Sequence, residues 1–381
     1  MPQQSDSLFV GVEIGGTKLQ AAVGRADGSP FLAAERATVD PANGAAGILE
    51  QISSLVTRLL ARYPAQAVGI GFGGPVDSVI VMPSAAMSNS PDATAANMPS
   101  QPTSTYTGVQ IKSHQISGWE NVPLGDWGRA LWQLPVVLGN DCDVAALAEA
   151  RFGAGAGART VFYVTVGTGI GGGFVIEGKV FGGGRPAVAE IGHLRPGLQA
   201  DRADDTVESL ASGWGLAAAA VQRLSGEVAQ PFDQLRRQVG SPNPAAVLRR
   251  LDDARQADEE YAADLLNRAG GNLEAITGKI VAQAAAEGNE VALEVLHHGC
   301  QALGWGIAQA VTLLAPEVVV IGGGVSLAGE QLFFTPLKQA IERYVFPPLR
   351  GSYEVLPAKL GEEVVVHGAL LLAAELSAAG A

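Results

Sequence analysis

The chain carries the same order of predicted elements twice, and this duplication limits the fold more than any other feature. In the first copy, an apolar run over residues 8–14 leads into the turn Gly15-Gly16-Thr17-Lys18, and a second apolar run covers 19–24. Apolar residues with helical spacing over 45–62 follow, and a buried run over 67–72 then ends in a pair of glycines. The first copy therefore reads as strand, glycine turn, strand, helix, strand and glycine turn.

The second copy begins with an apolar run over 160–166, which a glycine turn over 167–173 joins to a further apolar stretch. A long helix predicted over 290–314 precedes a short strand over 318–321 that again ends in glycines. Two similar α/β halves are therefore expected, and the space between two such halves is a preferred site for ligands. We predict an α/β fold with two similar domains around a cleft.

The composition excludes several classes of protein. With 381 residues, of which 47% are hydrophobic, the chain is long enough for two cores. A net charge of −13 argues against binding nucleic acid or an anionic membrane through a positive field. Cys142 and Cys300 are the only cysteines, so a disulfide framework is not expected. The N-terminus lacks the pattern of a signal peptide and the apolar runs are short, which predicts a cytoplasmic protein with no membrane span.

Two glycine segments, 69–74 and 167–172, match the dinucleotide pattern G-x-G-x-x-G. A Rossmann fingerprint has to open a helix whose N-terminus holds the pyrophosphate. Here 174–176 reads as a strand, and β-branched residues follow Pro75 after the first segment. The context therefore argues against NAD, and the sequence also lacks the spacing of a Walker-type loop.

A glycine turn between two strands can bind phosphate in another way. Glycine lets the backbone approach phosphate oxygens, and successive amides form a concavity that attracts anions. Thr17 and Thr168 add hydroxyl groups, and Lys18 adds a positive charge. Structural hairpins without a ligand are the alternative. The pair of turns, with a third at Gly322, favours a triphosphate held from both sides.

Five motifs follow one another along nearly the whole chain. They are the opening strand and turn at 12–18, Asn140-Asp141 followed by 145–149, the glycine segment 164–173, Glu190-Ile191-Gly192-His193, and the glycine turn within 319–325. In this order they resemble the motifs of the ROK family of sugar kinases. The resemblance implies an actin-like ATPase (ribonuclease H-like) fold. It places one domain at 1–139 plus 361–381, with an insertion at 82–107, and the other at 140–360.

The resemblance also implies roles for individual residues. Asp141 is the expected proton acceptor, although an Asp at the start of a helix is also a favoured N-cap. The implied sugar ligands are Gln115, Asn140, Glu190, His193 and Glu208. The implied ATP-binding residues are Gly15, Gly16, Thr17, Lys18, Thr168, Gly169, Gly323 and Gly324, and Glu13 is placed near the magnesium. The alternatives are a surface carboxylate for Glu208 and a local pair, or a structural histidine, for Glu190 and His193.

The chain departs from the family's pattern at three places. Glu13 stands where many relatives carry Asp, so the carboxylate reaches further. The stretch 194–215 contains none of the three cysteines of the family's usual zinc site, and His193 alone does not make a structural zinc site, so we predict no zinc. Gln115 stands near the position of a sugar-binding Asn, just after the insertion.

These observations predict an enzyme that uses ATP with magnesium to phosphorylate a hexose hydroxyl, with glucose favoured. Fructose or an N-acetylated hexosamine is the nearest alternative substrate. A sugar sensor without catalysis and a structural actin-like ATPase are alternatives of another class. The expected partners are a small-molecule sugar and ATP, with neither nucleic acid nor membrane, and a homodimer stays open. The composition of 82–107 favours a solvated surface excursion over a lid.

Overall fold

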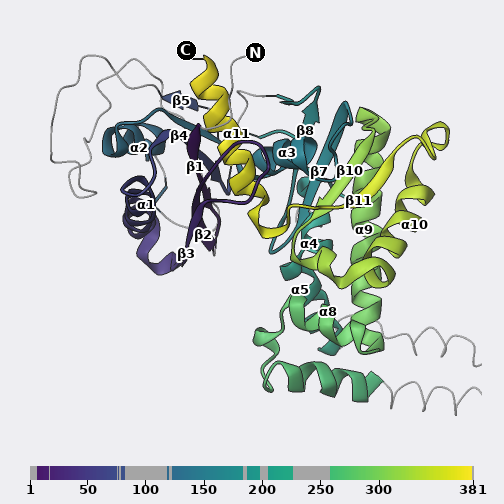
Figure 1. The fold of residues 1–381 in the computed structure, drawn as a ribbon. Coiled ribbons are helices and arrows are strands. Elements are labelled where there is room, and N and C mark those ends of the chain that lie inside the picture. Colours follow the sequence, from purple (N-terminus) through teal and green to yellow (C-terminus); the bar gives the residue numbers. More distant parts are fainter. Residues whose placement is uncertain are drawn as a thin grey trace, which may run out of the picture.

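The computed structural model of the protein describes residues 7–16, 18–74, 76, 79–81, 118–119, 122–182, 187–197, 205–225 and 258–379. Within these ranges the chain forms two mixed β-sheets that lie in separate halves of the molecule, each with helices packed against it (Figure 1). The predicted insertion at 82–107 falls outside the described residues.

The first sheet has the strand order β3-β2-β1-β4-β6-β5. Its strands are β1 (Leu8–Ile14), β2 (Lys18–Gly24), β3 (Ala33–Thr38), β4 (Ala65–Phe72), β5 (Val79–Val81) and β6 (Val136–Asn140). β1 pairs antiparallel with β2 across the predicted glycine turn and parallel with β4 on its other side. Helices α1 (Gly44–Leu60) and α2 (Leu124–Trp132) bury apolar side chains in the core of this half.

The second sheet repeats the central arrangement of the first and has the strand order β11-β10-β7-β8-β9. Its strands are β7 (Thr160–Val166), β8 (Ile170–Ile176), β9 (Lys179–Val180), β10 (Val318–Gly322) and β11 (Glu354–Pro357). β7 pairs antiparallel with β8 across its glycine turn and parallel with β10 on the other side. The predicted duplication is confirmed. β2-β1-β4 and β8-β7-β10 have the same relative strand directions, and in each set a glycine turn joins the antiparallel pair.

Helices of the second half cover this sheet and extend below it in Figure 1. They are α3 (Asp141–Phe152), α4 (Val207–Ala211), α5 (Gly213–Leu224), a helix over 258–268, α8 (Gly278–Ala286), α9 (Glu290–Leu314) and α10 (Thr335–Tyr344). Short helical turns are η1 (Pro41–Asn43), η3 (Ile191–His193), η4 (Leu273–Ala275), η5 (Gly324–Ala328), η6 (Glu330–Phe334), η7 (Pro347–Leu349) and η8 (Gly361–Glu363). Among the described residues, no helix has the length and apolar character that a membrane span requires.

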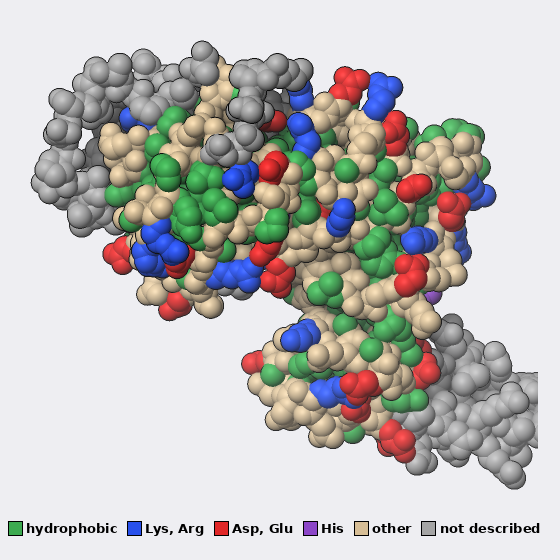
Figure 2. Space-filling model, in the orientation of Figure 1, with side chains coloured by type: hydrophobic (Ala, Val, Ile, Leu, Met, Phe, Trp, Pro, Cys, Tyr) green, Lys and Arg blue, Asp and Glu red, His purple; other side chains and the backbone are tan. Residues whose placement is uncertain are grey.

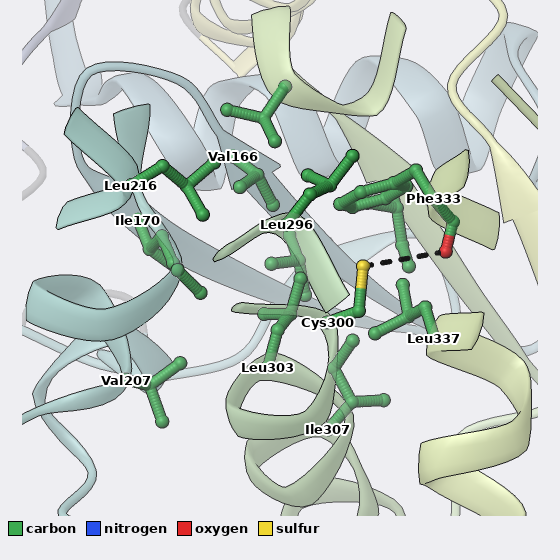
Figure 3. Close-up of a cluster of buried hydrophobic side chains, with 14 of the residues drawn as sticks. Val166, Ile170, Val207, Leu216, Leu296, Cys300, Leu303, Ile307, Phe333 and Leu337 are labelled. Atoms are coloured by element: carbon green, nitrogen blue, oxygen red, sulfur yellow. Dashed lines mark hydrogen bonds between the residues drawn. The ribbon is translucent and has the colours of Figure 1, made fainter. Parts of the chain in front are cut away.

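Buried apolar side chains of the second half anchor the glycine turn between β7 and β8. Val166 and Ile170 stand on either side of that turn, and both side chains are buried in one apolar cluster with Leu216 and Phe333 (Figure 3). Backbone atoms of the turn therefore remain at the edge of the core, while the flanking side chains anchor it. The buried side chains thus hold both ends of the glycine turn in the core.

The C-terminal helix α11 (Val364–Ala379) returns to the first sheet, where it contacts β1, β4 and α3. The approach is very close, because a Cβ atom added at Gly69 of β4 would lie 1.9 Å from the carbonyl oxygen of Ala369. Only a glycine permits this contact. The boundaries 1–139 plus 361–381 and 140–360 stay a prediction.

Candidate active site

The first glycine turn lies beside the end of β4. The turn closes with a 2.9 Å hydrogen bond from the Gly15 amide to the Lys18 carbonyl. The Gly73 amide donates to the Ile14 carbonyl at 2.8 Å, which brings the glycines after β4 against the end of β1. Of the predicted phosphate-binding residues, Gly15, Gly16 and Lys18 lie on this turn, and Thr17 falls outside the described residues.

Glu13, near the end of β1, holds its carboxylate in a polar network. Its side chain is 14% exposed, and the Lys18 ammonium lies 3.4 Å from its Oε2 atom. The side-chain amide of Gln20 donates a hydrogen bond to the same oxygen. Burial raises the pKa of Glu13, and the nearby Lys18 charge acts in the opposite direction. Lys18 also donates to the Glu362 carbonyl at 3.0 Å, so its predicted phosphate-binding role would require it to exchange partners.

Asn140 and Asp141 have different roles at the start of α3. Asn140 is the N-cap, and its side-chain oxygen accepts from the amides of Cys142 and Asp143. Its Nδ2 atom donates to the Gly74 carbonyl at 2.9 Å, which ties the helix start to the turn after β4. The alternative that Asp141 is the N-cap is therefore wrong. A sugar contact for Asn140 stays a prediction.

The Asp141 carboxylate lies beside Gly73, at the turn after β4 that packs against the end of β1. A Cβ atom added at Gly73 would lie 3.3 Å from Asp141 Oδ2 and 3.6 Å from the Cα atom of Gly15. The other oxygen, Oδ1, accepts from the Cys142 amide at 2.8 Å. The carboxylate is thus held at Oδ1, while Oδ2 lies beside the turn after β4.

Burial and neighbouring carboxylates raise the pKa values of Asp141 and Asp143. Burial raises the pKa of Asp141 to about 6, and the negative charges of Glu13 and Glu190 add to the shift. Burial also raises the pKa of Asp143 to about 7, with further contributions from Glu190 and Asp141. Carboxyl groups with pKa values near neutrality are suited to accept and release protons. Sequence reasoning missed Asp143, and its place two residues after Asp141 on the same helix start was the available signal.

The second glycine turn joins β7 to β8 and contacts α4 and α5. The Gly213 amide donates to the Gly167 carbonyl at 2.8 Å, and the Ile170 amide donates to Glu208 Oε2 at 2.7 Å. Glu208 is therefore half-buried against the predicted phosphate turn, and the surface-carboxylate alternative is wrong. A Cβ atom added at Gly167 would meet nothing within 4 Å, so there is space above the turn beside Thr168.

The Glu190 to His193 motif packs against the start of β8. Ile191 and Gly192 are buried, and a Cβ atom at Gly192 would lie 2.2 Å from the Ile170 carbonyl oxygen. His193 is exposed, whereas Glu190 is half-buried and close enough for its charge to act on Asp141. Glu190 and His193 thus differ in exposure, and a sugar contact for either residue stays a prediction.

The third glycine turn lies against the end of β7. Gly323 has a left-handed φ of +90°, and a Cβ atom there would lie 2.5 Å from the backbone of Val166. A Cβ atom at the next residue, Gly324, would meet nothing within 4 Å. Packing therefore explains the glycine at 323, and it does not explain the one at 324.

The N-terminus of α3 links the first turn to the second sheet. A Cβ atom at Gly171 of β8 would lie 2.4 Å from the Cys142 sulfur, so β8 passes directly behind the helix start that carries Asp141. The charges of Glu13 and Glu190 act on the pKa of Asp141, and Glu208 lies against the second turn. Gln115 falls outside the described residues.

Comparison with known proteins identifies the family behind this arrangement. The model of the ROK family matches residues 9–376. The chain belongs to the ROK family. Its fold is accordingly the actin-like ATPase fold, as predicted from the motifs. All five motifs lie within the matched range.

Known ROK proteins similar to this chain include glucokinases. The glucokinase of Halalkalibacterium halodurans is 29% identical over 96% of this chain and 94% of its own length. The glucokinase of Thermotoga maritima is 27% identical over 95% of each chain. A crystal structure of a ROK family glucokinase from Streptomyces griseus, in complex with glucose and AMPPNP, matches with a TM-score of 0.69 and 30% identity. That match covers 97% of this chain and 100% of the other.

Proposed function

We propose that this ROK protein transfers a phosphoryl group from ATP to a hydroxyl of a hexose, with glucose as the favoured substrate. The observation that carries the proposal is the position of Asp141, whose carboxylate lies beside Gly73, where the turn after β4 packs against the first glycine turn, and whose pKa burial raises to about 6. Similarity to glucokinases along nearly the whole chain supports glucose as the sugar.

Phosphoryl transfer needs a proton acceptor, positioned substrates and stabilised charge. Asp141 is mostly ionised at neutral pH and accepts the proton of the attacking hydroxyl. Backbone amides of the first and second glycine turns bind the phosphates, together with Lys18 and Thr168. The sugar is held by Asn140, Glu190, His193 and Glu208, with Gln115 from outside the described residues.

Magnesium is the metal that an ATP-dependent transfer implies, and the residues present fit it. Among the described residues, no group of three or more His, Cys, Asp or Glu side chains could hold a metal ion. Magnesium suits such a site, because it keeps several waters and binds mainly through phosphate oxygens and one or two carboxylates. Glu13 is the carboxylate we assign to it. When bound with ATP, magnesium neutralises charge on the phosphate oxygens.

A coupled assay of ADP release tests this proposal across substrates. Purified protein is given MgATP with glucose, fructose, mannose, N-acetylglucosamine, N-acetylmannosamine or xylose. We expect sugar-dependent ADP release with the highest kcat/KM for glucose. A protein that binds one of these sugars by calorimetry, yet releases ADP no faster than without sugar, would instead be a sensor.

A further inference from the structure

Gln20 is an unusual side chain for the middle of a sheet. It lies on β2, is 3% exposed, and stands directly opposite Glu13 in the β1–β2 register. Buried polar side chains destabilise a protein unless hydrogen bonds satisfy them. The partners of this amide therefore indicate why it is there.

The amide nitrogen of Gln20 has two acceptors. It donates to Glu13 Oε2, and it donates to the carbonyl oxygen of Glu362 at 2.8 Å. The amide group has two N–H bonds, so these contacts use its whole donor capacity. Lys18 donates to the same Glu362 carbonyl at 3.0 Å. The Glu362 carbonyl thus accepts from both Lys18 and Gln20, and both of these side chains contact the Glu13 carboxylate.

A second carboxylate fixes the segment that supplies this carbonyl. Glu149 on α3 is 0% exposed, and its Oε1 atom accepts from the amides of Lys359 and Leu360 at 2.9 and 2.8 Å. Its Oε2 atom accepts from the Ala154 amide at 2.7 Å. The connection between β11 and α11 is therefore held against α3 two residues before Glu362.

A glutamate at the end of a strand needs such restraint if its carboxylate is to stay in one place. Its side chain has three rotatable bonds, and ordering a flexible side chain costs about 1–2 kcal/mol. Residues behind a metal ligand orient it, and losing one lowers metal affinity or activity by about 10- to 100-fold. Gln20 occupies such a position, because its amide donates to the Glu13 carboxylate that we assign to magnesium.

We propose that Gln20 is a positioning residue for phosphoryl transfer, because its amide holds the Glu13 carboxylate beside the first glycine turn while the Glu362 carbonyl holds the amide. This inference rests on the proposed function for its catalytic consequence. The contact between Gln20 and Glu13 does not depend on it.

The first test is the magnesium dependence of the intact protein carrying Gln20→Met, which keeps the volume and removes both donors. We expect the magnesium concentration for half-maximal activity at fixed ATP to rise about 10- to 100-fold. Glucose affinity without nucleotide should stay within about twofold. Gln51→Met is the matched control, because the Gln51 amide donates to the Thr38 carbonyl in the same half of the molecule. It should change neither quantity.

The second test measures stability and needs no activity. Unfolding constants are compared for Glu13→Ala, Gln20→Met and the double variant. If the two side chains act as one unit, the double variant should depart from the product of the single effects by about fivefold or more. If Gln20→Met does not fold, Gln20→Asn keeps the amide on a shorter stem and should raise the magnesium requirement to a smaller extent.

The outcomes separate this inference from the proposed function. An active wild type whose Gln20→Met variant keeps the wild-type magnesium dependence would overturn the inference alone, and so would multiplicative unfolding effects. A wild type that phosphorylates no sugar, yet shows the expected coupling in unfolding, would overturn the proposed function and retain the contact.

Discussion

At the scale of single residues, Asn140 and Asp141 show how neighbours take separate roles. Both residue types are favoured N-caps, so the sequence alone could not assign the cap. The structure decides it through the backbone, because Asn140 is extended (φ −63°, ψ 142°) and Asp141 is the first helical residue. Capping therefore occupies the Asn140 side chain and leaves Asp141 Oδ2 beside Gly73.

The raised pKa of Asp141 predicts the pH dependence of the reaction. A general base works in its ionised form, and the pKa of Asp141 is raised to about 6. We therefore expect kcat/KM for the sugar to rise with pH through about 6 and then level off. Asp143→Asn removes a neighbouring carboxyl whose pKa is raised to about 7, so a rise that stays near pH 6 in this variant excludes Asp143 as its source. A flat profile from roughly pH 5 to 8 would contradict the assignment.

The two adjacent glycines of the third turn give a second residue-level prediction. Gly324→Ala adds a methyl group where nothing lies within 4 Å, so stability should stay unchanged or rise slightly. If ATP occupies that space, the KM for ATP should increase about 10- to 100-fold, as expected for one extra methyl group against a ligand. Gly323→Ala is the contrast, because its Cβ would overlap the Val166 backbone and should lower the melting temperature. An unchanged KM for ATP in Gly324→Ala would remove Gly324 from the nucleotide site.

At the scale of elements, α3 carries the proposed base at one end and a structural carboxylate near the other. Glu149 accepts three backbone N–H groups, from Ala154, Lys359 and Leu360. It thereby joins the end of α3 to the connection that leads into α11. α3 also contacts β4 and β6 of the first sheet and β7 and β8 of the second, so one helix packs against both sheets.

Removing that carboxylate should destabilise the whole chain. Glu149→Ala leaves three N–H groups without an acceptor in a site with no exposure, and we expect a loss of about 2–5 kcal/mol in the free energy of unfolding. Denaturant unfolding measures it. Glu50→Ala removes an exposed carboxylate from the surface of α1 and should change stability by less than about 0.5 kcal/mol. Equal effects of the two substitutions would show that the Glu149 contacts add nothing.

Local sequence patterns predicted the helices and strands, but they did not predict the contacts between them. Helical spacing predicted α9 at 290–314, the range that the structure shows. Glycine turns predicted both antiparallel pairs. The hydrogen bond from the Ile170 amide to Glu208 was missed, because it joins a turn to a helix that is distant in sequence. Periodicity carries no information about such a pair.

At the scale of the whole molecule, the duplication in the sequence predicted two sheets of like topology, since apolar runs and glycine turns recur in the same order. The contact from Gln20 to Glu362 was not predictable, because it spans 342 positions. Basic and acidic side chains are interspersed over the face of the described residues shown in Figure 2.

Metal content gives a prediction for the whole molecule. The stretch 194–215 contains no cysteine, so the ligands of the family's usual zinc site are missing from the sequence. We expect purified protein to contain no stoichiometric zinc by elemental analysis. A chelator should stop activity, and magnesium alone should restore it. One tightly bound zinc per chain would contradict this prediction.

The most direct test of the central claim is to measure product formation by wild type and Asp141→Asn side by side. Wild-type protein with MgATP and glucose should yield hexose phosphate and ADP in equal amounts, as followed by mass spectrometry and ADP release. Asp141→Asn should bind glucose with an affinity within a few fold of wild type and form product about 10²- to 10⁴-fold more slowly, because the proton acceptor is lost and the shape is kept. A variant that retains most of its turnover would contradict the assignment of Asp141, and a folded wild type that forms no hexose phosphate would contradict the proposed glucose kinase.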